Sequence, residues 1–139
     1  MSAPTPRRVL FVCIGNCCRS QMAEGFASAR GAGILVAESA GLRPAGVVVE
    51  QTVRAMAQKN IDISSYSSKA LRLDEANKYD LIVNMSGFRL PDGIRVPVVT
   101  WGVPDPIGES DEVYAQVRDR IEALVIELVK DLRQATDSA

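Results

Sequence analysis

Apolar and polar residues succeed one another along this chain in blocks that predict alternating strands and helices. Short runs of apolar and β-branched residues are typical of buried strands, whereas apolar residues three or four positions apart are typical of amphipathic helices. The pattern predicts strands at 7–12, 34–38, 80–83 and 96–99, and helices at 20–30 and 48–59. Because Pro97 has no backbone N–H to donate, the fourth strand is expected at an edge of the sheet.

The most regular apolar stripe lies near the end of the chain. Ser110 and Asp111 suit the start of a helix, and Lys130 and Arg133 suit its end. Between them, residues at helical spacing are Val113, Val117, Ile121, Leu124, Val125, Leu128 and Leu132. We expect this stripe to pack on one face of the sheet.

Strands separated by helices predict an α/β fold in three layers, with a four-stranded parallel sheet flanked by helices. The length of 139 residues suits one domain over 1–139, with residues 1–6 and 135–139 frayed. Ligands of such sheets bind where the carboxyl ends of the strands meet.

Composition narrows the classes of function. Sixteen basic and seventeen acidic residues give a net charge of −1, which offers no basic surface for nucleic acid. The absence of histidine excludes Cys–His dyads, Ser–His–Asp triads and histidine metal ligands. The three cysteines share one loop, unlike a disulfide framework or a zinc site, so we expect no metal and no cofactor. No apolar run reaches membrane-spanning length and no leader is recognisable, so we expect a cytoplasmic protein without a membrane partner.

The residues with the clearest chemistry follow the first predicted strand. Cys13 ends that strand, five residues turn, and Arg19 and Ser20 open a helix. The backbone N–H groups of such a loop converge on one point and bind an anion, and an arginine adds a bidentate fork for two oxygens. This positive environment favours Cys13 as a thiolate nucleophile. The predicted oxyanion-binding residues are Ile14, Gly15, Asn16, Cys17, Cys18 and Arg19.

The turn itself needs residues that tolerate positive φ. Gly15 is one such residue, and Asn16 also adopts left-handed conformations and hydrogen-bonds locally. Ser20 lies where its hydroxyl can donate to the sulfur of Cys13.

The pattern C-x5-R-S over Cys13–Ser20 resembles the phosphate-binding loop of low-molecular-weight protein tyrosine phosphatases, whose fold is flavodoxin-like. The longer string over 9–27 is similar to the arsenate reductases that share this fold. Two further matches are Ser39-Ala40-Gly41, after the second predicted strand, and Asp105-Pro106. The resemblance extends from Arg7 to the final helix.

The phosphatase resemblance implies a phosphomonoester hydrolase that forms a phosphocysteine at Cys13. Asp105 then serves as the general acid for the leaving oxygen and afterwards as the general base for water. Arg19 and the loop amides stabilise the equatorial oxygens, and Ser20 assists departure of the sulfur. Phosphate or a phosphoprotein is the expected partner.

Arsenate is the alternative substrate, because it is nearly isosteric with phosphate. Its reduction needs a second thiol, and the thioredoxin- and glutaredoxin-linked relatives carry extra cysteines after the third strand. The corresponding residues here, 84–89, include no cysteine, so a reductase of this sequence needs an external thiol reductant. A third alternative, a non-catalytic phosphate sensor, does not explain why both Cys13 and Asp105 are present.

The remaining loop cysteines and the mouth of the site leave alternatives open. The resemblance implies that Cys18 is a redox partner that forms a reversible disulfide with Cys13. The alternative is that Cys18 fills space, as we expect for Cys17.

Tyrosine-specific relatives place aromatic residues after Asp-Pro and after the second strand. This chain has Ile107-Gly108 and a non-aromatic 41–46 there, which argues against a preference for phosphotyrosine. Trp101 and Phe88 are the aromatic residues left to contact a substrate.

Overall fold

The computed structural model describes the backbone of residues 5–138 and the side chains of residues 5–135. Its elements are β1 (Arg7–Cys13), α1 (Arg19–Arg30), β2 (Leu35–Gly41), α2 (Glu50–Ala57), α3 (Leu73–Ala76), β3 (Leu81–Asn84), β4 (Val98–Thr100) and α4 (Asp111–Ser138). All strand pairs are parallel, in the order β2-β1-β3-β4, which confirms the predicted four-stranded parallel sheet with its fourth strand at an edge.

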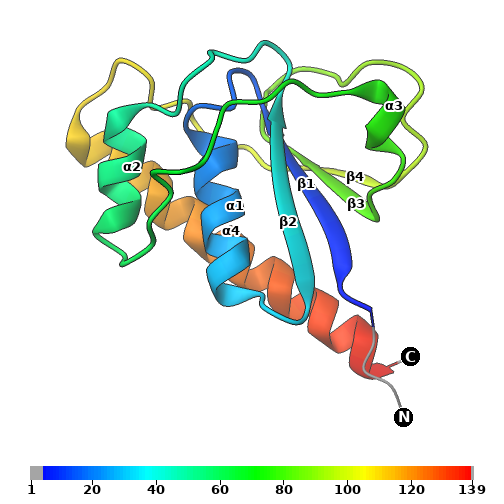
Figure 1. Ribbon diagram of the computed structural model, residues 1–139. Helices are drawn as coiled ribbons and strands as arrows, with labels where there is room; N and C mark the ends of the chain where they lie inside the picture. The colour runs from blue at the N-terminus through cyan, green and yellow to red at the C-terminus, as the bar shows by residue number, and fades with distance from the viewer. Residues whose placement is uncertain (1–4, 139) are drawn as a thin grey trace.

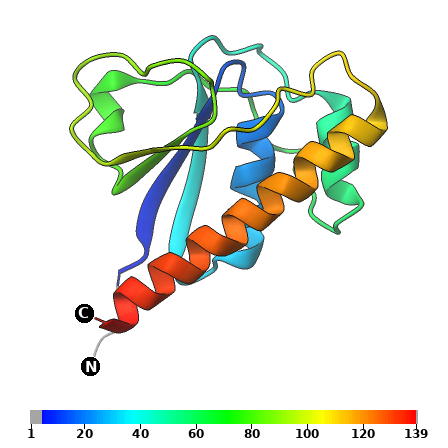
Figure 2. The ribbon, with the colours of Figure 1, turned by 180° about the vertical axis from the view of Figure 1, so that it is seen from behind.

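The sheet lies between two unequal layers. Helices α1, α2 and α4 cover one face, and the short α3 with its neighbouring loops covers the other (Figures 1 and 2). Side chains along β1 point alternately to the two faces of the sheet. Val9 and Phe11 belong to the core under the helices, and Leu10 and Val12 belong to the core on the α3 side. The predicted stripe of α4 packs as expected against the first of these cores.

Several boundaries differ from the prediction. β2 does not end at residue 38 but continues through Ser39-Ala40-Gly41, which pair with the end of β1, so that this motif is part of the strand. The helix predicted at 48–59 is confined to α2, and α3 was not predicted. α4 continues past Arg133 to Ser138, into the segment expected to fray. The fraying expected of residues 1–4 and 139 lies outside the described residues.

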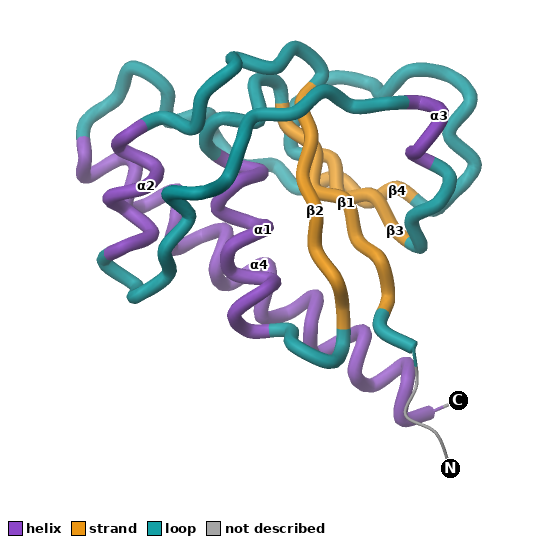
Figure 3. Tube along the Cα trace, in the orientation of Figure 1, coloured by secondary structure: helices purple, strands orange, loops and turns teal. Residues whose placement is uncertain are grey.

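The loops that follow the strands gather at one end of the sheet (Figure 3). They include the residues after β1, the segment after β2, and the connections after β3 and β4. Among the described residues, no helix is long and apolar enough to cross a membrane.

Candidate active site

The loop between β1 and α1 is held by its carbonyl groups. Backbone N–H groups of the segment after β2 donate to four of them: Leu42 to Cys13 (3.0 Å), Arg43 to Ile14 (2.8 Å), Ala45 to Gly15 (2.9 Å) and Val49 to Cys17 (3.2 Å). By contrast, the N–H groups of residues 14–18 find no acceptor in the described part of the chain. A loop with its carbonyls tied back and its amides unpaired has the polarity that an anion requires.

Asn16 is the residue around which this loop turns. It is fully buried and has a φ of 48°, whereas Gly15, the other residue proposed for a left-handed turn, has no positive φ. The Asn16 side chain accepts hydrogen bonds from the backbone N–H of Lys69 (2.8 Å) and from Nε2 of Gln21 (3.0 Å). Gly15 matters for space instead, because a Cβ there would lie 3.0 Å from the sulfur of Cys17.

Cys13 ends β1 with its side chain buried. Its sulfur lies 2.9 Å from Oγ of Ser20, as the spacing predicted. Asn16 donates from Nδ2 to the same hydroxyl oxygen at 2.7 Å. Because this oxygen already accepts a hydrogen bond, the hydroxyl hydrogen of Ser20 is free to point at the sulfur of Cys13.

Arg19 is almost completely buried and its guanidinium is fixed in place. Nη1 donates to the carbonyls of Met85 (2.6 Å), after β3, and Val103 (3.1 Å), after β4. Nη2 lies 3.6 Å from Oδ2 of Asp105. Asp105 is itself positioned by the backbone N–H of Ile107, which donates to Oδ1 at 3.1 Å. The structure thus brings the predicted arginine and the predicted acid together.

The other two cysteines form a pair. Sγ of Cys17 and Sγ of Cys18 lie 3.7 Å apart, and Cys18 also contacts the hydroxyl of Tyr114, on α4, at 3.6 Å. The hydrogen bond between the two sulfurs lowers the pKa of Cys18 to about 7. The same interaction, together with burial, raises the pKa of Cys17 above its ordinary range. All three cysteines are free thiols.

These groups meet in a small cavity of about 100 Å³. Its walls are Cys13, Ile14, Gly15, Cys17, Cys18, Arg19, Ala45, Asp105 and Ile107. Every residue proposed for the site therefore lines this cavity except Asn16 and Ser20. These two residues hydrogen-bond to each other, and Ser20 contacts the sulfur of Cys13. The aromatic residues lie elsewhere: Trp101 packs against Phe11 at 5.8 Å between ring centroids, and Phe88 is exposed.

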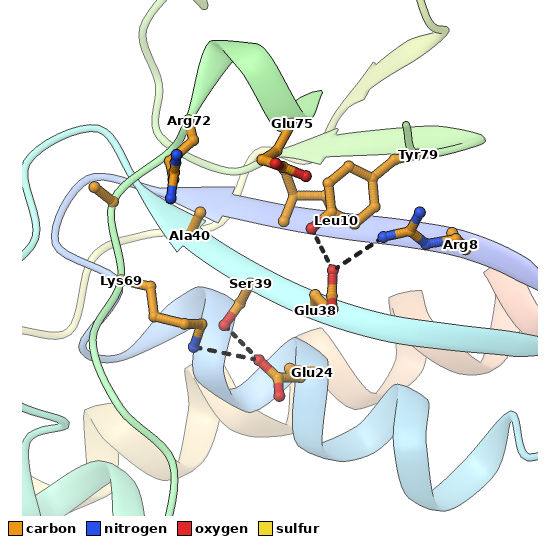
Figure 4. A pocket seen from close by; sticks show the side chains of 11 residues that line it. Arg8, Leu10, Glu24, Glu38, Ser39, Ala40, Lys69, Arg72, Glu75 and Tyr79 are labelled. Atoms are coloured by element: carbon orange, nitrogen blue, oxygen red, sulfur yellow. Dashed lines mark hydrogen bonds and ion pairs between the residues drawn. The ribbon is translucent and has the colours of Figure 1, made fainter. Parts of the chain in front are cut away.

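A larger hollow of about 560 Å³ lies along β2 and is also lined by residues of β1 and α3 (Figure 4). Its charged side chains all have partners, and Arg72 and Glu75 pair with Asp74 and Lys78 outside the lining. Glu38 contacts Arg8 and Tyr79, and Glu24 accepts a hydrogen bond from Ser39 and lies 4.0 Å from Lys69. The larger hollow contains no cysteine and its charges are balanced, whereas Cys13 and Asp105 both line the smaller cavity.

No group of three or more residues with metal-binding side chains occurs among the described residues.

The sequence did not predict the role of Gly41, which supports the backbone of the oxyanion loop. A Cβ on Gly41 would lie 2.7 Å from the carbonyl oxygen of Ile14 and 2.9 Å from the backbone nitrogen of Asn16. The motif Ser39-Ala40-Gly41 contained this signal, because a glycine ending a strand beside a tight loop indicates close backbone approach.

The chain is similar to known proteins over most of its length. The family model described as low molecular weight phosphotyrosine protein phosphatase matches residues 8–91. A glutaredoxin arsenate reductase of Synechocystis is 35% identical over 88% of this chain and 98% of its own. A solved arsenate reductase in a phosphate-binding state is 35% identical, with a TM-score of 0.84 over 91% of this chain and 98% of its own. A solved arginine phosphatase is 27% identical, with a TM-score of 0.80 over 91% of this chain and 95% of its own.

Proposed function

The chain belongs to the low molecular weight phosphotyrosine protein phosphatase family, and from that premise we propose that it is an arsenate reductase acting through Cys13 and an external thiol. The observation that carries the proposal is the cavity of about 100 Å³ at Cys13, which suits a free tetrahedral oxyanion and has no aromatic wall for an organic leaving group. Relatives that match nearly the whole chain and are named arsenate reductases support this choice.

The first step is attack of the Cys13 thiolate on arsenic. An As–S bond forms and an As–O bond breaks, and the departing hydroxide takes a proton from Asp105 and leaves as water. The loop amides and Arg19 stabilise the remaining oxygens. Ser20 holds the thiolate before the attack, through the hydrogen bond of 2.9 Å.

The second step transfers electrons. An external thiolate attacks the sulfur of Cys13, an S–S bond forms, and the S–As bond breaks with its electron pair remaining on arsenic, which becomes trivalent. A second external thiol then displaces Cys13 from the mixed disulfide, so that two thiols are oxidised for each arsenate. We assign this role to an external thiol because residues 84–89 include no cysteine. Such thiols are abundant in the cytoplasm, where we expect the protein to act.

Phosphomonoester hydrolysis is the second candidate. It is favoured by Asp105, which lies 3.6 Å from Arg19 and lines the same cavity as Cys13. An acid in that position suits protonation of a leaving alkoxide or phenoxide and activation of water against a phosphocysteine. The likeness to an arginine phosphatase is consistent with this chemistry.

Both candidates are tested by parallel assays of the purified protein. Arsenite formation is measured from arsenate with glutathione, with glutaredoxin and glutathione, and with thioredoxin and its reductase; phosphate release is measured from para-nitrophenyl phosphate. Wild type is compared with Cys13→Ser and Asp105→Asn. Asp92→Asn is the matched control, because Asp92 is exposed, pairs with Arg89 and does not line the cavity at Cys13.

Arsenite formation that requires Cys13 and one of these thiol systems is the expected result. Phosphate release that requires Cys13 and Asp105, without arsenite formation, would replace the reductase with the phosphatase. Absence of both activities while phosphate still binds would remove both in favour of an oxyanion sensor.

A further inference from the structure

Cys17 and Cys18 lie at the active site, yet the proposed reaction uses neither thiol. Side chains of adjacent residues point to opposite faces of a strand, so neighbouring cysteines rarely bring their sulfurs together. Here the turn between the loop and α1 does so, because Cys18 has φ −136° and ψ −85°, which is neither helical nor extended. The result is a pair of sulfurs 3.7 Å apart on the wall of the cavity that also contains Cys13.

We propose that Cys17 and Cys18 form a binding site for trivalent arsenic and hold the arsenite produced at Cys13. Two free thiols at this separation can both bond to one atom, and neither is committed to a disulfide. Soft ligands such as thiolates prefer soft centres, and trivalent arsenic is softer than the pentavalent substrate. The pair therefore distinguishes product from substrate.

The binding reaction is a ligand exchange without a change of oxidation state. Arsenous acid loses two hydroxyl groups and each cysteine loses one proton, so that two As–S bonds replace two As–O bonds and two waters leave. The third hydroxyl stays on arsenic. Two sulfurs therefore suffice for this adduct.

Retention of the product has a consequence for turnover, and this part rests on the proposed function. Arsenite released beside the pair stays in the cavity until other thiols remove it. The external thiol then has two tasks, reduction of Cys13 and removal of arsenite. We expect inhibition by arsenite that a dithiol such as dithiothreitol relieves.

The site is tested by titrating the reduced protein with sodium arsenite, without arsenate or turnover. Native mass spectrometry counts bound arsenic, and near-ultraviolet absorption follows the As–S bonds. Cys13→Ser retains the pair and is expected to bind one arsenite with unchanged affinity. Cys17→Ser and Cys18→Ser each remove one of the two bonds and are expected to bind at least about 100-fold more weakly, the lower range for loss of a second linked contact.

A measurement on the unchanged protein covers the case of a variant that fails to fold. Arsenite is expected to protect Cys17 and Cys18 from maleimide while Cys13 remains reactive, and fragmentation of the peptide that contains all three cysteines assigns each label. The proposal is overturned if arsenite does not bind, if binding requires Cys13, or if Cys17→Ser and Cys18→Ser bind like wild type. Because turnover is not involved, a protein that binds arsenite but fails to reduce arsenate contradicts the proposed function and leaves this site intact.

Discussion

Gly41, at the end of β2, lies close against the backbone of the oxyanion loop. In Gly41→Ala the new Cβ would lie 2.7 Å from the carbonyl oxygen of Ile14, 2.9 Å from the backbone nitrogen of Asn16 and 3.0 Å from its Cβ. The atoms of Ile14 and Asn16 that it would meet belong to the backbone or are a Cβ. Rotation of a flexible side chain therefore cannot relieve the contact. The clash must therefore be relieved by displacement of the loop itself.

The expected cost follows from this geometry. Overpacking of a rigid site costs about 1–3 kcal/mol, and in a chain of this size each kcal/mol lowers Tm by about 3–5 °C. Displacement of the loop moves its amides relative to Cys13, and a misplacement of about 1 Å reduces turnover by about 100-fold. We expect kcat/KM to fall by more than the loss of stability alone explains.

Gly102→Ala is the matched control, because a Cβ at Gly102 has no atom within 4 Å. Both variants are measured by thermal unfolding and by arsenate and para-nitrophenyl phosphate kinetics. If Gly41→Ala melts and turns over like Gly102→Ala, the close approach does not constrain the loop and the reasoning fails.

Ser20→Ala removes a hydrogen bond to a charged sulfur, worth about 1.5–3 kcal/mol, and should slow alkylation of Cys13 by iodoacetate at neutral pH by about 10- to 100-fold; an unchanged rate would show that the 2.9 Å contact does not stabilise the thiolate. Arg19→Lys loses the planar guanidinium, whose Nη1 donates to two carbonyls while Nη2 lies beside Asp105, and should reduce kcat by about 10²–10³-fold, whereas near-normal kinetics would mean that charge alone suffices. Burial raises the pKa of Glu24 above its ordinary 4.5, so the folded protein holds this proton more tightly than the unfolded chain. The free energy of unfolding should therefore decline as pH rises from about 4.5 through the folded pKa, and Glu24→Gln should lack that part of the decline in urea titrations across this range.

The sequence predicted the order of strands and helices because their apolar patterns are local and regular. It also predicted the contact between Cys13 and Ser20, since both lie within one strand–loop–helix unit. The end of β2 was missed because Ser39, Ala40 and Gly41 have little strand preference of their own. They are held in the sheet by pairing with β1, and Gly41 also pairs with Ala70 on its other side.

The details of the loop depended on distant partners. The left-handed turn falls on Asn16 rather than on Gly15, because the Asn16 side chain is fixed by Gln21 and by the backbone of Lys69. The pairing of Cys17 with Cys18 depends on a backbone conformation that neither helix nor strand periodicity encodes.

The contacts of Arg19 also bear on how the protein folds. Its guanidinium joins the start of α1 to carbonyls 66 and 84 residues further along the chain, after β3 and β4. Contacts between such distant residues form late, because the entropy of closing long loops must first be overcome. During refolding, oxyanion binding should therefore return after the helical signal has recovered, and a nascent chain that has not reached Val103 should lack a competent site. Catalytic competence in this molecule thus depends on residues that are made long after its nucleophile.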